Sequence, residues 1–264
     1  MRHIIVLFCL LGGSVFAREL TLDQAVVQAL AGNKDLAASS LEVDKAEGRV
    51  IQAGQPRNPS LEISARSDLL FGNEGERGVT LGLSQAIPRK DRLRKAREAA
   101  SLSVEQRRAL VRDTQRQLVG EVQTLFVQAL NFNRQAEARQ RLLVAGEKLA
   151  ALIEQRYQRG EVPQTDIAPI RIENAKLAQE QRLLLAERTA TELRLKRLLG
   201  LAADEPLVLV GDPDELTAPL SAAAGAELVA ESRPDYEAAR AAVNQADAEV
   251  RVAKVEAYDD FTVG

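Results

Sequence analysis

The sequence predicts a mainly α-helical protein in which a long antiparallel helical hairpin is combined with a short β-hairpin. Three observations support this fold class. The segment from Lys90 to Arg159 contains no proline and only two glycines. Residues 61–87 instead alternate between apolar and polar side chains. Aromatic residues are only 3% of the chain, whereas alanine, leucine, glutamate, glutamine and arginine dominate, a composition typical of long helices.

Residues 1–17 have the layout of a secretory signal peptide. A basic start precedes an apolar stretch from Ile4 to Leu11, and Val15-Phe16-Ala17 offers a cleavage site. The apolar stretch is shorter than the roughly 20 residues that a membrane-spanning helix needs, so a retained anchor is the weaker alternative. Cys9 lies inside the apolar stretch, which argues against lipid attachment. We expect export and a mature chain that begins at Arg18.

Removing this signal also removes the only cysteine, the only histidine and the only methionine of the chain. The remaining residues cannot form the Cys/His sites that hold zinc or copper, and they offer no histidine for nucleophilic catalysis. The net charge of −3 gives no basic surplus for nucleic-acid binding. We therefore expect no catalytic residues, no cofactor, no metal site and no nucleic-acid partner.

The N-terminal segment of the mature chain, residues 18–57, predicts one helix from about Leu22 to Gln55. Residues 58–88 then predict a β-hairpin, because apolar and polar side chains alternate on both sides of a polar, glycine-rich loop. The apolar positions are Leu61, Ile63, Ala65, Leu69 and Phe71 before the loop, and Val79, Leu81, Leu83 and Ile87 after it. Such strands fit either a half-buried soluble sheet or the weak signature of a membrane β-barrel.

Residues 89–200 predict a long helical hairpin. Its first arm, from Lys90 to Arg159, would be about 105 Å long at ~1.5 Å per residue. Apolar residues recur along this arm at coiled-coil spacing, so the arm requires partner helices. One seam position is formed by Val104, Val111, Leu118, Leu125 and Phe132, and the other by Val122, Ala129, Ala136, Leu143 and Ala150.

The second arm follows directly. Gly160 ends the first helix in the manner of a C-terminal glycine, and Pro163 turns the chain. Thr165 can then cap a helix that runs from Asp166 to about Leu199. Pro169 falls in the first turn of that helix, where its missing N–H costs little. The two arms are expected to lie antiparallel.

A repeat relates the two ends of the chain. A shift of 200 residues aligns residues 35–63 with residues 235–263 and preserves the order of helix and strand. Residues 201–219 then form a linker between the repeats, and residues 220–264 begin a second repeat. We expect the chain to be a C-terminally truncated piece of a two-repeat protein.

Several short motifs, taken in their order and spacing, resemble the TolC family of outer-membrane factors. They are Leu20–Ala25, Asn58-Pro59 before the first strand, Leu83–Ile87 in the second strand, Arg156–Val162 at the hairpin turn, Leu195–Gly200, Arg233–Asp235 and Asp260–Gly264. The resemblance is greatest to the branch that serves cobalt-zinc-cadmium and related heavy-metal pumps. The usual Gly-Gly-Lys-Arg after the second strand reads Arg89-Lys90-Asp91-Arg92 here.

The resemblance implies a homotrimer in which each protomer gives four strands to one twelve-stranded outer-membrane β-barrel. An α-barrel tunnel of helices would continue this barrel through the periplasm. The resemblance also implies a passive export duct that is surrounded by outer-membrane lipid and docks on a periplasmic adaptor and an inner-membrane pump of the RND type. Heavy-metal cations or other small toxic solutes would be exported.

The resemblance also assigns functional residues. Arg159, Gly160 and Glu161 would form the tip that contacts the adaptor. Asp166 would help to hold the periplasmic aperture shut, although a carboxylate at a helix start also simply complements the helix dipole. Polar strand positions, for which solvation alone is the alternative, could line the pore: Glu62, Arg66, Asp68 and Thr80.

Two other functions remain open at this stage. A periplasmic adaptor also combines a helical hairpin with β-structure, but it would need compact, Gly-rich lipoyl-like halves on both sides of the hairpin. A structural coiled-coil protein would require neither the alternating strands nor the repeat. An enzyme is the least favoured class, because only carboxylate, lysine and tyrosine chemistry is available.

Overall fold

The computed structural model describes residues 18–67, 77–89, 91–216, 232–258 and 260–263. The chain forms two compact units. The first unit contains Met1–Lys34 and Gln117–Ala222, and the second contains Asp35–Arg116 and Ala223–Gly264. Helix α3, Arg92–Gln158, contributes one part to each unit.

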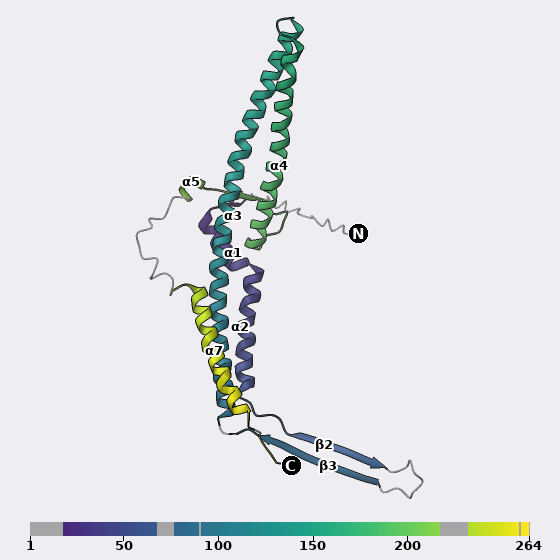
Figure 1. Ribbon diagram of the computed structural model, residues 1–264, viewed down its shortest axis with the longest axis vertical. Helices are drawn as coiled ribbons and strands as arrows, with labels where there is room; N and C mark the ends of the chain where they lie inside the picture. Colours follow the sequence, from purple (N-terminus) through teal and green to yellow (C-terminus); the bar gives the residue numbers. More distant parts are fainter. Residues whose placement is uncertain (1–17, 68–76, 90, 217–231, 259, 264) are drawn as a thin grey trace, which may run out of the picture. The chain divides into compact units, whose positions relative to one another are not determined.

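The first unit contains the predicted helical hairpin. The C-terminal part of α3 and helix α4, Ile167–Leu199, run side by side in opposite directions and are joined by a tight turn (Figure 1). A short 3₁₀ helix, η2, at Gln164–Asp166 precedes α4. The predicted antiparallel hairpin is therefore present, with ends within a few residues of the expected ones.

Both arms of the hairpin end at a glycine in the left-handed conformation. Gly160 has a φ of 75°, and its N–H and that of Glu161 donate to the carbonyls of Tyr157 and Arg156. Gly200, with a φ of 71°, closes α4 with the same pair of bonds, which satisfy carbonyls that have no partner inside the helix. The predicted helix end at Gly160 is confirmed.

The start of α4 differs from the prediction. Asp166, rather than Thr165, occupies the N-cap position, and no side chain makes a capping hydrogen bond. The reason is the 3₁₀ turn: the N–H of Asp166 donates to the carbonyl of Pro163 at 3.2 Å, so the backbone itself closes the turn before the helix begins.

At its other end the hairpin packs on a small base. Helix α1, Leu22–Gly32, lies against α4. Strands β1, Arg18–Leu20, and β4, Leu207–Leu209, pair in parallel, and a short helix, α5, follows at Pro213–Leu216. The largest completely covered side chains of the described residues lie here: Phe126, Leu20, Leu195, Leu199, Val122 and Pro213. Residues 201–219, predicted to be a linker, thus contribute β4 and the buried Pro213 to this base.

The single N-terminal helix of the prediction is in fact two helices. Helix α1 ends at Gly32 and helix α2, Lys34–Ala53, starts after Asn33, whose backbone is extended. The buried Asn33 side chain donates to the Leu198 carbonyl at 3.0 Å, and Gly32 lies against Gly200 so closely that a side chain on either would clash. These contacts with the end of α4 break the helix, and sequence periodicity does not reveal them.

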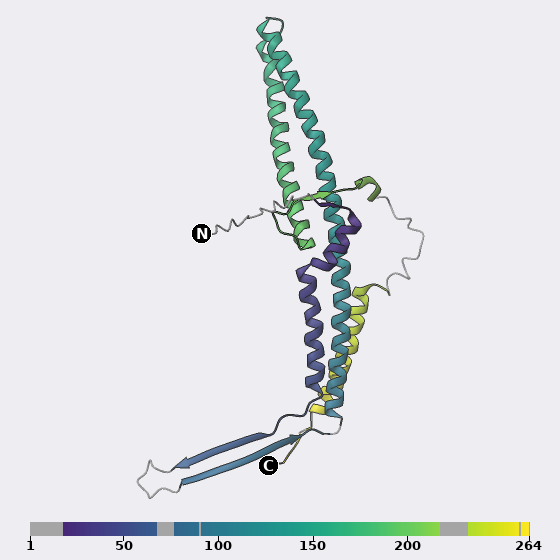
Figure 2. The ribbon, with the colours of Figure 1, turned by 180° about the vertical axis from the view of Figure 1, so that it is seen from behind.

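In the second unit, helices α2 and α7, Pro234–Glu256, lie on either side of the N-terminal part of α3 (Figures 1 and 2). An ion pair connects each of these helices to α3. Arg108 of α3 lies 2.7 Å from Glu47 of α2, and Arg112 lies 2.8 Å from Glu237 of α7. Because these pairs are exposed, each contributes little stability and serves mainly to set the helix register.

Three strands complete the second unit. β2, Ser60–Ser67, pairs antiparallel with β3, Arg77–Ile87, and β3 also pairs with the short β5, Phe261–Val263. The predicted β-hairpin is confirmed over the described residues. Helix α7 followed by β5 has the same order as α2 followed by β2; the two-repeat organisation itself stays a prediction.

The predicted seam of α3 is largely correct. Six of its members are buried, namely Val104, Leu118, Leu125, Val122, Ala129 and Ala136, whereas Val111, Phe132, Leu143 and Ala150 are only partly covered. Phe126 and Leu130 were not assigned to the seam, yet they are buried. Within the described residues, no helix is both long enough and apolar enough to cross a membrane.

Candidate functional site

The hairpin turn carries the three residues predicted to form the tip. Glu161 lies between two arginines, with its carboxylate oxygens 3.4 Å from Nε of Arg159 and 3.8 Å from Nε of Arg156. Nothing lies within 4 Å of the position where a Cβ on Gly160 would stand. The turn is thus an open surface on which charge and backbone are both accessible to a partner.

Asp166 lies at the start of α4 and is exposed. Its carboxylate accepts a hydrogen bond from the Thr165 hydroxyl at 3.4 Å. Both interpretations of this residue, an aperture contact and a helix-start carboxylate, fit this geometry.

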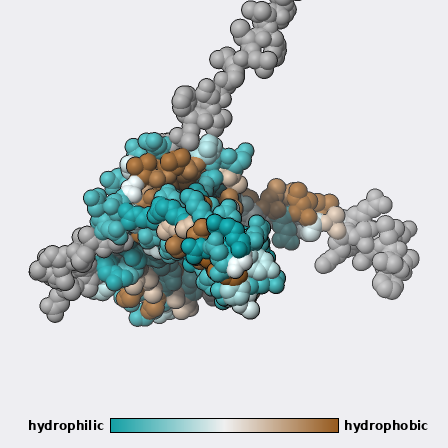
Figure 3. All heavy atoms as spheres, turned by 90° about the horizontal axis from the view of Figure 1, so that it is seen from above, coloured by the Kyte–Doolittle hydropathy of each residue, from teal (hydrophilic) through white to brown (hydrophobic). Residues whose placement is uncertain are grey.

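The two faces of the strand pair differ sharply. On one face Leu61 opposes Leu83, Ile63 opposes Leu81, and Ala65 opposes Val79. These apolar side chains are uncovered, with exposed fractions of 60% for Leu61, 65% for Ile63, 73% for Val79, 69% for Leu81 and 63% for Leu83. They form a hydrophobic patch over β2 and β3 (Figure 3). A face of this kind, left in water, is expected to mark a contact with lipid or with another protein.

The opposite face is polar or small. Glu62 opposes Gly82 and Ser64 opposes Thr80, and the hydroxyls of Ser60 and Ser84 are 2.7 Å apart. The predicted pore residues Glu62 and Thr80 therefore share one face. Arg66 pairs with Gly78 through its backbone, and Asp68 lies outside the described residues.

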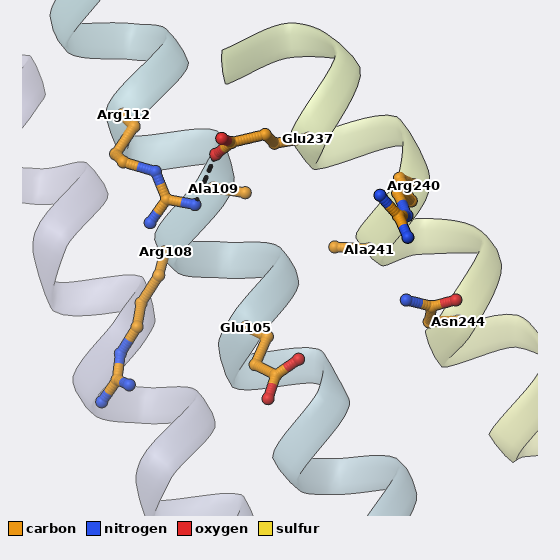
Figure 4. A pocket seen from close by; sticks show the side chains of 8 residues that line it. All are labelled: Glu105, Arg108, Ala109, Arg112, Glu237, Arg240, Ala241 and Asn244. Atoms are coloured by element: carbon orange, nitrogen blue, oxygen red, sulfur yellow. Dashed lines mark hydrogen bonds and ion pairs between the residues drawn. The ribbon is translucent and has the colours of Figure 1, made fainter. Parts of the chain in front are cut away.

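An open groove runs between α3 and α7 in the second unit (Figure 4). Its lining is charged apart from Ala109, Ala241 and Asn244, and Glu237 forms an ion pair across it with Arg112. Sequence reasoning did not single out these residues, although Arg108 and Arg112 have the spacing of one helix face. Arg108, Arg112 and Glu237 are engaged in ion pairs, and Glu105 and Arg240 are exposed, so a solvated helix surface explains the groove without a ligand.

A cluster of charged and aromatic residues lies where the strands meet the helices. Arg92 of α3 stands 2.6 Å from the carboxylate of Asp260, just before β5, and this guanidinium holds the pKa of Asp260 below its usual range. Arg89 lies over the rings of Tyr258 and Phe261, at 5.2 and 5.7 Å from their centres. Only the spacing of basic residues after Ile87 could have indicated this cluster from sequence.

The described residues contain no group of three or more metal-binding side chains. A strand pair with one uncovered apolar face and one polar face has the alternation that strands of membrane β-barrels show.

Comparison with known proteins specifies the family. The model of the outer membrane efflux protein family matches residues 25–201, more than half of the chain. The chain therefore belongs to the outer membrane efflux protein family, which comprises channels and not enzymes. Membership places the protein in the outer membrane with its helical part in the periplasm.

Individual relatives agree with this assignment. The chain is 29% identical over 262 residues to the pyoverdine export outer membrane protein OpmQ of Pseudomonas putida, covering 92% of this chain and 55% of that protein. A membrane protein of Pseudomonas aeruginosa shares the fold with a TM-score of 0.70 and 24% identity, over 88% of this chain and 57% of the other. The CmeC outer membrane channel of Campylobacter jejuni does so with a TM-score of 0.69 and 14% identity, over 91% and 54%.

The chain thus spans a little over half the length of these relatives. The predicted fold class, a helical hairpin with short strands, is confirmed by the same structures. The predicted heavy-metal branch is a finer assignment that these comparisons do not single out.

Proposed function

We propose that this chain supplies strands and helices to a trimeric export duct of a tripartite efflux system. The observation that carries the proposal is the strand pair, whose apolar face is uncovered while its other face is polar or small. In a closed barrel the apolar face meets lipid and the polar face lines the lumen. Closure is required because backbone groups without partners are costly in lipid.

Each protomer would contribute β2 and β3 to the barrel, and the strand that starts as β5 would begin the next pair. The β3–β5 pairing supports this continuation, since Phe261 opposes Ile87 and so extends the apolar face of the sheet. Residues 58–88 would then be the barrel segment and residues 89–200 the periplasmic hairpin of a two-repeat protomer. Glu62 and Thr80 would line the lumen, together with Arg66 and Asp68 if the alternation continues.

The hairpin turn would contact a periplasmic adaptor, which in turn connects to an inner-membrane pump of the RND type. The open backbone at Gly160 and the Arg156–Glu161–Arg159 ion pairs support this assignment, because such a surface can exchange its internal pairs for pairs with a partner. Asp166, close to this turn in sequence, would help to close the aperture through polar contacts between protomers.

The transported substrate would be a small solute selected by the pump. The relative OpmQ is a pyoverdine export protein, which makes pyoverdine the first candidate substrate. Heavy-metal cations, the substrate expected from the sequence motifs, are the second candidate. A duct of either kind needs no resident metal site.

The proposal is tested by expressing the complete gene product and measuring conductance in planar lipid bilayers. Discrete, reproducible conductance steps from an outer-membrane trimer are expected. Glu62→Lys should change the cation-to-anion selectivity of these steps, whereas Glu187→Lys, at an exposed position of α4, should leave it unchanged. A monomeric product that gives no conductance in any lipid would contradict the proposal.

A further inference from the structure

Basic side chains gather at the strand–helix boundary of the second unit. Arg57 precedes β2, Arg89 follows β3, and Arg97 lies in the second turn of α3; all three are exposed. Two of them have contacts at this boundary: Gln85 of β3 donates to the Arg57 carbonyl at 2.8 Å, and the side chain of Arg97 borders Gly54 at the end of α2. Arg92, which pairs with Asp260, lowers the pKa of that carboxyl, and Arg57 adds a smaller effect in the same direction.

Within the described residues these three guanidinium groups have no close ion-pair partner, and Arg57 acts on Asp260 only at longer range. Arg92 pairs with Asp260 and Arg94 with Asp91, but no ion pair joins Arg57, Arg89 or Arg97 to a described carboxylate. The first turn of α3 also contains no acidic residue. This boundary therefore carries a local positive charge, although the whole chain has a net charge of −3.

Arg89 is held in a particular orientation. Its guanidinium lies over both Tyr258 and Phe261. Stacking on an aromatic face occupies the flat side of the guanidinium and leaves its N–H groups, which lie in the plane, free to donate. An arginine placed in this way is prepared to bind a phosphate through two parallel hydrogen bonds.

The positive boundary adjoins the uncovered apolar face of the sheet. Ile87, two residues before Arg89, opposes Phe261, and both are exposed, as is Val263. Aromatic and apolar side chains followed by basic ones match, in order, the acyl chains and then the headgroups of a bilayer. The surface therefore complements a lipid layer whose headgroups are negatively charged.

We propose that Arg57, Arg89 and Arg97 form a surface that binds the anionic phospholipid headgroups of the leaflet on the helix side of the barrel. This inference rests on the proposed function, since it requires the strand pair to enter a membrane. Tyr258 and Phe261 hold Arg89 at the level of the phosphates while the apolar face contacts the acyl chains. The surface fixes the depth at which the strands lie in the membrane.

The test is flotation of the full purified chain with vesicles of phosphatidylcholine alone or of an equimolar mixture with phosphatidylglycerol. One arginine near an anionic surface strengthens binding by about fivefold, so three give roughly 100-fold tighter association with the mixed vesicles. The triple variant Arg57→Gln/Arg89→Gln/Arg97→Gln should lose this preference. Added salt should weaken the preference of the unchanged chain, because exposed charges are screened.

A charge-matched control removes three exposed arginines of the helical hairpin, with Arg141→Gln, Arg182→Gln and Arg194→Gln, and should keep the preference. If the unchanged chain binds both vesicles equally, the lipid-binding inference is wrong while the proposed function stands. If it binds neither, the lipid-binding inference is wrong, and the conductance of the complete gene product still decides the proposed function. Should the triple variant fail to fold by circular dichroism, the lipid preference and salt dependence of the unchanged chain decide alone.

Discussion

Two strand pairs in this protein lie in different environments. The β1–β4 pair belongs to a core, in which Leu20 and the nearby Phe126 are completely covered. On one face of the β2–β3 pair, in contrast, five apolar side chains are more than half exposed: Leu61, Ile63, Val79, Leu81 and Leu83. The difference shows that the β1–β4 region is stabilised by contacts within the chain. The apolar face of β2 and β3 instead requires contact with lipid or with another protein.

The largest expected effect concerns the core beside the β1–β4 pair. Phe126→Ala should destabilise the first unit by about 3–5 kcal/mol, because it removes a buried ring and leaves a cavity beside Leu130 and Gly211. Urea unfolding followed by circular dichroism measures this loss. Leu81→Ala on the open strand face is the matched comparison and should cost less than about 1 kcal/mol in the absence of membrane. Equal losses would contradict the distinction between the two pairs.

The glycine contact at the base of the hairpin gives the next effect. At Gly200 the φ of 71° disfavours a side chain, and a Cβ would lie 2.3 Å from the Gly32 carbonyl oxygen. Gly200→Ala should therefore cost roughly 2–4 kcal/mol. Gly120→Ala is the control, because nothing lies within 4 Å of its added Cβ. This control should stabilise α3 by about 1 kcal/mol, because alanine has the higher helix propensity. Thermal unfolding should therefore show a lower Tm for Gly200→Ala and a higher Tm for Gly120→Ala.

A smaller, pH-dependent effect is expected at the edge of the same base. The Asp214 N–H and then the Arg134 side chain lower the pKa of Asp212 in the folded chain. The contribution of Asp212 to stability is therefore complete above its unfolded pKa of about 3.9 and is lost as the pH falls through the lower folded pKa. Asp212→Ala should slightly lower Tm at pH 7, and this difference should disappear in strong acid.

Asp204→Ala provides the control for that experiment, since Asp204 lies in the preceding loop, is exposed and has no described side-chain partner. Its effect on Tm should be negligible at both pH values. A difference at Asp212 that grows on acidification would show that the sign of the pKa shift is wrong.

The same comparison explains what the sequence could predict. The hairpin, its glycine end at Gly160 and the strand alternation at Leu61–Ile87 are local patterns, and they were predicted correctly. The break at Asn33 and the burial of Phe126 arise from contacts with Leu198 and with the region of Gly211, both distant in sequence. Periodicity carries no information on such contacts. The tip residues were identified by resemblance alone, and their role remains a proposal.

The most direct test of the account asks which face of the open strand pair meets lipid. Cys9, the only cysteine, lies in the predicted signal peptide, so single cysteines can be introduced without background and spin-labelled in the membrane-reconstituted gene product. Labels at Ile63 and Leu81 should be relaxed by oxygen, which concentrates in lipid. Labels at Ser64 and Thr80 should be relaxed by a water-soluble nickel chelate, as should a label at Val208, an exposed apolar residue of β4. Stronger oxygen relaxation at Ser64 and Thr80 than at Ile63 and Leu81 would contradict the assignment of the apolar face to lipid.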